Sequence, residues 1–320
     1  MDVRQVRNTA LLVLGALIWG LAFAAQSVGS GYVEAYTFLA CRSWLACGFL
    51  VVLLFVRRRL AAGRHVRPAV TPAPRATALR GGILCGIFLF AASAAQQMAV
   101  GEVSTAKASF LTALYVVLVP VCGIFLGRRP DRRIWICVAV SVAGLYLLCM
   151  AGHDTLSLTV SELKLLLCAL LFAVQILLVG HYSPRVDGVM LSLYQFLTTS
   201  VLSTVFMFLT EHPQWQQIKG AGVAILYCGI LSSGVGYTLQ IIGQRGLDPT
   251  IASLAMCLES VFGALAGWVL LGQKLSPVEL TGCLLMFAAI VGSTLATGHS
   301  AEPTAAAAES GPEPDAAQQK

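Results

Sequence analysis

The feature that most constrains this chain is a series of ten apolar runs, each long enough to cross a lipid bilayer. They lie at about 9–28, 35–56, 79–99, 103–126, 133–151, 163–181, 189–209, 221–243, 249–271 and 277–297. About 20 mostly apolar residues span the hydrocarbon core, where a helix satisfies its own backbone hydrogen bonds. Charged residues make up only 11% of the chain, against roughly 25% in soluble domains. The sequence therefore predicts an all-α membrane protein with ten transmembrane helices.

The loops between the runs carry a strong charge asymmetry. If the N-terminus is cytoplasmic, the external segments contain only Lys164, Lys219 and Lys274 as basic residues, whereas Arg is concentrated in the cytoplasmic segments. Because basic loops stay in the cytoplasm, we expect a multi-pass protein of the plasma (inner) membrane with both termini cytoplasmic. The basic residues sit in short loops, so the net charge of +6 favours contact with membrane lipids over binding of nucleic acid.

The chain also contains a weak internal repeat. Residues 1–151 and 152–297 each hold five of the apolar runs, and Gln96 falls on Gln240 when the halves are aligned. Since five is odd, the halves cross the membrane in opposite directions, as in the two inverted five-helix repeats of many secondary transporters, which place substrate near the midplane. The stretch 298–320 is rich in Ala, Pro and Glu, and we expect a disordered cytoplasmic tail.

Several segments resemble one family. The stretch SLAMCLESVFGALAGWVLLGQKLSPVELTGCLLMFAAIVG is similar to the last two helices of the EamA-type branch of the drug/metabolite transporter superfamily. ALIWGLAF, ACRSWLACGF and SFLTALYVVLVPVCGIFLGRRP, in the first, second and fourth runs, also resemble it. The resemblance implies a central cavity between helices 1–4 and 6–9, with helices 5 and 10 stabilising the bundles or mediating a homodimer. The chain departs from the family pattern at Arg128 and Gln273, where Glu is frequent, and at Ser260, where Pro is frequent.

Three charged residues lie inside predicted spans and are candidates for the site. Glu259 is near the middle of its run, where an ionised side chain costs about 3 kcal/mol. It is placed to bind a substrate amine or to carry a proton, and hydrogen-bonded helix packing is the alternative. Arg42 suits either a carboxylate clamp or a structural or gating contact with helix carbonyls. Lys107 either snorkels to the external interface or attracts a carboxylate.

Amide and aromatic side chains in the spans complete the candidate site. An unpaired amide is costly in hydrocarbon, so we expect the glutamines to share a polar cavity in which Arg42 and Gln195 occupy approximately corresponding positions. For each residue, interhelical packing is the alternative. The predicted substrate and coupling cavity comprises Glu259, Arg42, Lys107, Gln96, Gln240, Gln195, Trp19, Tyr115 and Tyr237.

The sequence does not indicate a metal site, a cofactor or an enzyme. All ten cysteines fall inside apolar runs, and no CxxC motif or Cys/His cluster is present, so neither a disulfide framework nor a zinc site is predicted. HExxH, GxSxG and Walker A motifs are also absent. These motifs would be expected of a metalloprotease, a serine hydrolase and an ATP-driven pump.

These features predict a secondary transporter that moves a small metabolite by alternating access, as an exporter or exchanger. Because both signs of charge are expected in the cavity, an amino acid or related zwitterion is the favoured substrate, with proton coupling through Glu259 as a hypothesis. The main rival is a multidrug exporter of quaternary cations attracted to Glu259. A non-transporting membrane protein and an intramembrane enzyme are less favoured alternatives.

Overall fold

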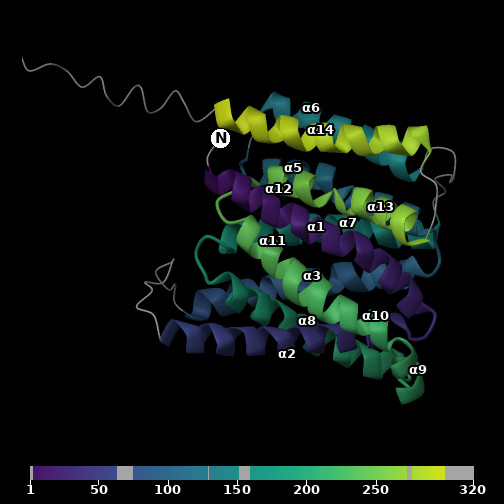
Figure 1. Cartoon of the computed structure of the whole chain (residues 1–320). Helices are drawn as coiled ribbons and strands as arrows, with labels where there is room; N and C mark the ends of the chain where they lie inside the picture. Colours follow the sequence, from purple (N-terminus) through teal and green to yellow (C-terminus); the bar gives the residue numbers. More distant parts are fainter. Residues whose placement is uncertain (1–2, 63–74, 129, 151–158, 272–275, 300–320) are drawn as a thin grey trace, which may run out of the picture.

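The computed structural model describes residues 3–62, 75–128, 130–150, 159–271 and 276–299, and Figure 1 shows these residues as a bundle of helices. Ten helical segments in these ranges are long and apolar enough to span a membrane. The predicted all-α membrane fold is therefore confirmed, whereas the tail beyond residue 299 lies outside the described residues. The helices are α1 Val3–Ser30, α2 Ala35–Ala62, α3 Arg75–Val100, α4 Thr105–Ala113, α5 Tyr115–Phe125, α6 Arg132–Cys149, α7 Val160–Tyr182, α8 Gly188–Thr210, α9 Trp215–Gly220, α10 Gly222–Leu226, η1 Tyr227–Gly236, α11 Tyr237–Gly243, α12 Pro249–Met256, α13 Glu259–Leu271 and α14 Pro277–His299.

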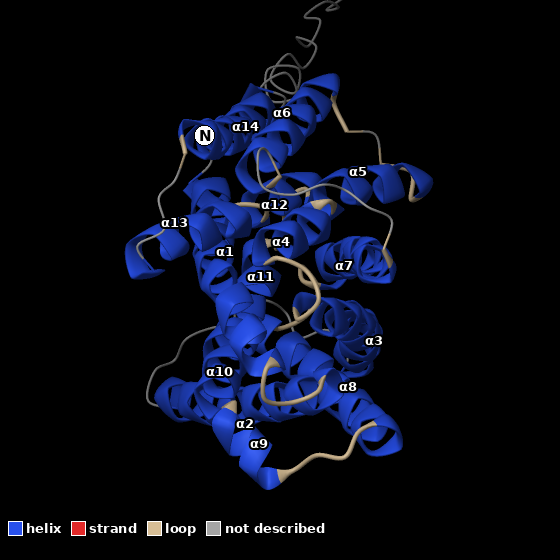
Figure 2. Ribbon diagram, turned by 90° about the vertical axis from the view of Figure 1, so that its right-hand side faces the viewer, coloured by secondary structure: helices blue, strands red, loops and turns tan. Residues whose placement is uncertain are grey.

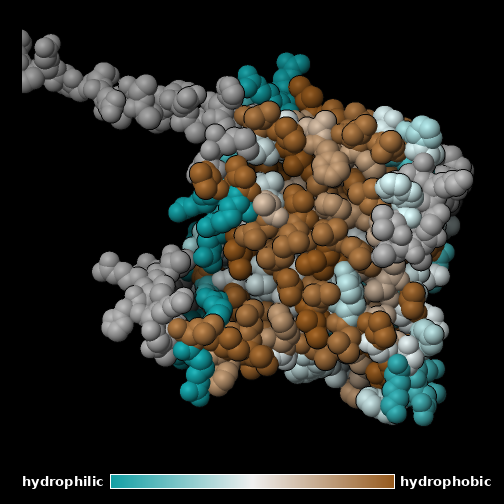
Figure 3. Space-filling view, viewed as in Figure 1, coloured by the Kyte–Doolittle hydropathy of each residue, from teal (hydrophilic) through white to brown (hydrophobic). Residues whose placement is uncertain are grey.

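The spanning helices run between two faces of the molecule. α1 begins and α14 ends at the same face, on the left of Figure 1, which we call the N-terminal face; the other is the opposite face. Apolar side chains cover the middle of the surface seen in Figure 3, and hydrophilic residues gather towards the helix ends. This is the pattern that a bilayer requires, because polar groups are costly at hydrocarbon depth.

The two halves of the chain interlock in a pattern with two-fold character. The extensive packing of α3 on α7 has its counterpart in the packing of α1 on η1 and α11, and the packing of α1 on α13 has its counterpart in that of α4 and α5 on α7. α2 packs on α8 and α6 packs on α14, each helix meeting its own equivalent. The α6–α14 pair forms one edge of the bundle, and α2 lies towards the other (Figure 2). Both halves therefore contribute to the centre of the bundle.

The fourth and ninth spans are each interrupted at equivalent positions. α4 ends before Leu114, and α12 ends before Cys257 and Leu258. Tight backbone bonds mark both sites, from Val117 N–H to the Leu114 carbonyl and from Ser260 N–H to the Cys257 carbonyl. Broken helices in corresponding positions of inverted repeats are characteristic of transporter binding sites. The apolar runs predicted a span at each place and gave no sign of the two interruptions.

The eighth span departs from its counterpart by containing a long π-helix. η1 covers ten residues between α10 and α11, whereas the third span is one continuous α-helix, α3. A π-helix is rare and often occurs at functional sites. Three glycines in η1 lie close to neighbouring side chains, with Gly234 against Phe49 and Gly236 against Trp19. The wide helix fits between α1 and α2 because these glycines carry no side chain.

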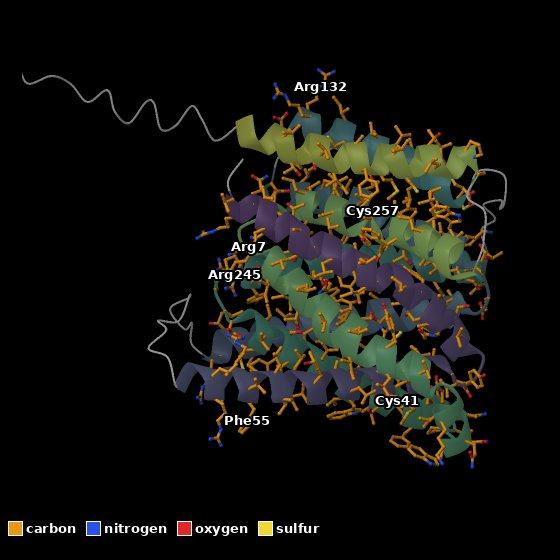
Figure 4. The ribbon with its side chains drawn as sticks, in the orientation of Figure 1. Arg7, Cys41, Phe55, Arg132, Arg245 and Cys257 are labelled. Atoms are coloured by element: carbon orange, nitrogen blue, oxygen red, sulfur yellow. The ribbon has the colours of Figure 1, made fainter. Side chains whose placement is uncertain are left out.

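Polar contacts tie the helices together at the N-terminal face. The Arg245 guanidinium donates to the carbonyls of Ser183 and Val186 at 2.9 and 2.7 Å. Its own backbone carbonyl accepts a 2.8 Å bond from the Asn8 side chain. Arg245 lies beside Arg7 at this face (Figure 4). These bonds connect the start of α1 to the loops that follow α7 and α11.

A second contact at this face joins Arg57 at the end of α2 to Asp187, which caps α8, at 3.0 Å. Partial burial pushes the pKa of Asp187 upward, but the bonds from Arg57 and from the backbone of Met190 and Val189 outweigh it and hold the pKa below its usual value. A carboxyl with a lowered folded-state pKa stabilises the fold above its unfolded pKa, and this contribution disappears as the pH falls through the folded pKa.

Candidate functional site

A narrow central cavity lies where the halves meet. Its empty space amounts to about 510 Å³ including the part open to solvent, but only about 40 Å³ admits the centre of a water-sized sphere. One water molecule needs at least about 10–15 Å³ by the latter measure, so the cavity suits a small ligand. It is lined by Trp19, Ala22, Phe23, Gln26, Arg42, Gln96, Thr112, Tyr115, Phe172, Gln175, Ile176, Ser232, Tyr237, Gln240, Met256 and Glu259.

Arg42 supplies the positive charge of the cavity. α2 holds it two turns from the opposite face, and its side chain is buried, with 4% of the residue exposed. Its Nη1 group donates to Oε1 of Gln26 on α1 at 3.0 Å. Its Nε–H is buried and has no hydrogen-bond partner in the described part of the chain. Arg42 therefore presents an unused charged donor beside the cavity.

Glu259 supplies the acidic group of the cavity and stands at the interruption of the ninth span. It is the first residue of α13, where the positive end of the helix dipole stabilises a carboxylate. Tyr115, the first residue of α5, donates its hydroxyl to Glu259 Oε1 at 3.2 Å. Tyr115 and Glu259 are 144 positions apart, the same separation as between Gln96 and Gln240. Tyr115 and Glu259 therefore occupy equivalent positions in the two halves and contact each other.

Three amides form a hydrogen-bonded chain on the N-terminal side of the cavity. Gln240 on α11 donates to Gln175 on α7 at 3.1 Å, and Gln175 donates to Gln195 on α8 at 3.0 Å. Gln240 Oε1 and Gln195 Nε2 are buried at the two ends of this chain without partners in the described residues. Gln195 itself does not line the cavity. It holds Gln175, which does.

Aromatic rings form one wall between the charges. Tyr237 lies 4.9 Å from Trp19 and 5.5 Å from Phe196, measured between ring centroids. The Trp19 indole N–H donates to the Ser232 carbonyl in η1 at 3.2 Å. Tyr237, Arg42 and Glu259 all line the same cavity. The wall therefore has polar groups along an otherwise apolar surface.

Lys107 does not line the cavity, and its ammonium is buried in an ion pair instead of reaching the solvent at the interface. Only 8% of the residue is exposed, and its ammonium pairs with Glu162 at 2.9 Å. Glu162 belongs to the capping box that starts α7. The apolar run around Lys107 gave no sign of this partner, which comes from the other half of the chain.

We expect Lys107→Met to destabilise the protein by about 3–5 kcal/mol, because it removes the ammonium that compensates the charge of the buried Glu162 carboxylate. The double variant Lys107→Met/Glu162→Gln should recover much of this loss, since Gln retains the capping box. Thermal unfolding in detergent measures both effects. A single variant as stable as the unaltered protein would show that the pair contributes nothing.

Seven of the nine predicted residues line the cavity, whereas Lys107 and Gln195 do not. Whether the seven act on a substrate stays a prediction. Phe23 and Phe172 were missed, although each stands three residues before a glutamine that also lines the cavity. The segment FAAQ in α1 thus repeats as FAVQ in α7. That repeated pattern is the signal that would have found them.

Comparison with known sequences gives the family. The EamA-like transporter family matches residues 8–150 and again residues 160–295. The chain belongs to this family. Each match covers five of the ten spans. The EamA chain is therefore a multi-pass membrane protein of a transporter family, and the described residues contain no group of three or more potential metal ligands.

Individual relatives of this EamA chain are distant. An uncharacterized transporter of Archaeoglobus fulgidus is 24% identical over 88% of the chain and 83% of its own length. The threonine/homoserine exporter RhtA of Escherichia coli (strain K12) is 26% identical over 54% of the chain and 58% of its own length. A solved crystal structure superposes with a TM-score of 0.71 at 18% identity, covering 92% of this chain and 99% of that one. This likeness shows the fold alone.

Proposed function

We propose that the protein exports a small zwitterionic metabolite, such as an amino acid, from the cytoplasm by alternating access. The observation that carries the proposal is the cavity that contains Arg42 from one half and Glu259 from the other. The concentration of Arg at the N-terminal face favours placing that face in the cytoplasm of a bacterial inner membrane.

A zwitterion suits these two charges better than a simple ion does. Each buried charge loses its hydration, and the loss is tolerable only where an opposite charge or hydrogen bonds compensate for it. Arg42 donates to the Gln26 amide and also contacts the Cys228 thiol, both of them uncharged partners, and Glu259 accepts from the Tyr115 hydroxyl. A substrate with a carboxylate and an ammonium offers a counter-charge to each residue at once.

The charge of Arg42 disfavours a multidrug exporter of cations, because it repels positive charge from one side of the cavity. Trp19 and Tyr237 do provide aromatic faces that attract cations. We therefore keep quaternary cation export as the second candidate, supported by those rings together with Glu259.

The relatives support export, and the site supports coupling to protons. RhtA is named a threonine/homoserine exporter, and its similarity to this chain makes amino acids with short polar side chains the first substrates to test. Glu259 is a buried carboxyl held by one neutral donor. It can therefore alternate between binding a proton and binding the ammonium of the substrate, which would drive export against proton entry.

We expect proteoliposomes containing the protein to transport radiolabelled homoserine and to leave its decarboxylated analogue, 3-aminopropan-1-ol, behind. The physical reason is that only homoserine satisfies Arg42 and Glu259 together. Empty liposomes give the background, and a tetraalkylammonium probe tests the rival function. Transport of the quaternary cation without homoserine flux would overturn the proposal.

A further inference from the structure

We infer that Arg42 determines specificity by binding the substrate carboxylate. In the second half of the protein, three side chains form a continuous hydrogen-bonded chain. In the first half, the equivalent chain lacks an acceptor at Arg42, and the substrate carboxylate supplies it. The inference rests on the proposed function for its substrate class, and it names the atoms that bind one end of the substrate. It follows from comparing the two ends of the cavity residue by residue.

The chain on the N-terminal side is continuous. Gln240 donates to Gln175, and Gln175 donates in turn to the carbonyl oxygen of Gln195. The middle amide thus accepts on its oxygen and donates from its nitrogen. Gln195 makes this possible because an amide side chain carries an acceptor as well as donors.

The equivalent chain on the opposite side is broken. Gln26, which corresponds to Gln175, accepts from Arg42 at 3.0 Å. Gln96, which corresponds to Gln240, donates to Thr112 at 3.3 Å instead of to Gln26. Arg42 stands where the other half has Gln195, and a guanidinium has no acceptor. An external acceptor is therefore needed beside Arg42 to complete the pattern.

The unused groups at this position indicate the kind of acceptor. Arg42 Nε–H is buried and unpartnered among the described residues, and its charge is not balanced by any acidic partner within ion-pair distance there. The planar guanidinium matches a carboxylate, which accepts two parallel N–H bonds. Gln26, which accepts from Arg42, lines the cavity, and so does Gln96. We assign these three residues as the carboxylate subsite.

The same comparison explains why the other end of a substrate would turn towards Glu259. Among the described residues that line the cavity, Gln240 Oε1 is a second buried polar atom without a hydrogen-bond partner. Gln240 and Glu259 both line the cavity, and their oxygens are acceptors that an ammonium group can use.

Calorimetric binding to the purified protein tests the assignment with three matched probes. Homoserine carries both charged groups, 4-hydroxybutyrate lacks the amine, and 3-aminopropan-1-ol lacks the carboxylate. We expect Arg42→Gln to weaken binding of the first two by about 30-fold or more, as for loss of a buried charged hydrogen bond. Binding of 3-aminopropan-1-ol should change by less than about threefold. The affinity of Arg42→Lys for homoserine and 4-hydroxybutyrate should fall between those of the unaltered protein and Arg42→Gln, because Lys keeps the charge but lacks the planar guanidinium.

Controls separate this role from a structural one. Arg57→Gln removes an Arg from the same helix outside the cavity, where its partner is Asp187, and should leave all three affinities unchanged. Equal weakening of all three probes in Arg42→Gln, or no weakening, would overturn the inference. So would failure of 4-hydroxybutyrate to bind the unaltered protein. Binding through Arg42 without homoserine flux in liposomes would instead overturn the proposed function alone.

Discussion

Replacement of Glu259 by Gln is expected to abolish accumulation of substrate driven by a pH gradient, with a loss of about 100-fold or more in initial rate. Gln has nearly the same shape and still accepts a hydrogen bond from Tyr115 at the position of Oε1, so the fold should be retained. It cannot bind or release a proton, and it offers no charge to a substrate ammonium. Proteoliposomes with an imposed pH gradient measure the rate.

A second variant and a second assay test whether Glu259 itself carries the proton. Tyr115→Phe removes the donor to Glu259 but leaves the carboxyl, so pH-driven transport should persist with a changed pH profile. Counterflow of labelled against unlabelled substrate needs no proton gradient and reports any binding that survives in Glu259→Gln. Undiminished pH-driven accumulation by Glu259→Gln would rule out this residue as the proton carrier.

Substitution of Gly20 by Ala is expected to lower both stability and transport, since α1 crosses α13 closely at this glycine. A Cβ atom on Gly20 would lie 2.6 Å from the Glu259 carbonyl oxygen and 2.7 Å from the Gly263 backbone nitrogen. Both atoms are backbone, so relief requires the helices to separate. Overpacking of this kind costs about 1–3 kcal/mol, and it also displaces the residue that carries the acidic group.

Gly48→Ala is the matched control, because a Cβ on Gly48 in α2 meets no atom within 4 Å. Ala is the better helix former there, so this variant should be as stable as the unaltered protein or slightly more so. Fluorescence-detected size exclusion after heating compares the two variants, and homoserine flux reports the site. A Gly20→Ala protein that matches Gly48→Ala in both assays would contradict the close crossing.

The sequence predicted the spans well and the detailed contacts poorly, for physical reasons. A span reveals itself through local hydropathy, and Arg42 and Glu259 were noticeable because charges are rare at membrane depth. The interruptions at Leu114 and Leu258 have no Gly or Pro at the break itself. The pairing of Lys107 with Glu162 depends on how two distant helices dock. Apolar runs contain no information of that kind.

The η1 helix is a second feature that hydropathy alone does not predict. Its segment reads as an ordinary apolar run with several glycines, and hydropathy does not distinguish π from α geometry. What selects the wider turn is the surrounding packing, in which Gly234 and Gly236 meet Phe49 and Trp19. A prediction from sequence would have needed the positions of those neighbours first.

The unequal occupants of equivalent positions also bear on how such a protein can arise. A half-length ancestor that paired with a second copy of itself would carry the same side chain at both equivalent positions, two arginines or two glutamines, and likewise two tyrosines or two glutamates. Joining the copies in one gene frees each to mutate alone. Arg42 at the position equivalent to Gln195, and Glu259 at the position equivalent to Tyr115, are differences that a pair of identical chains could not carry.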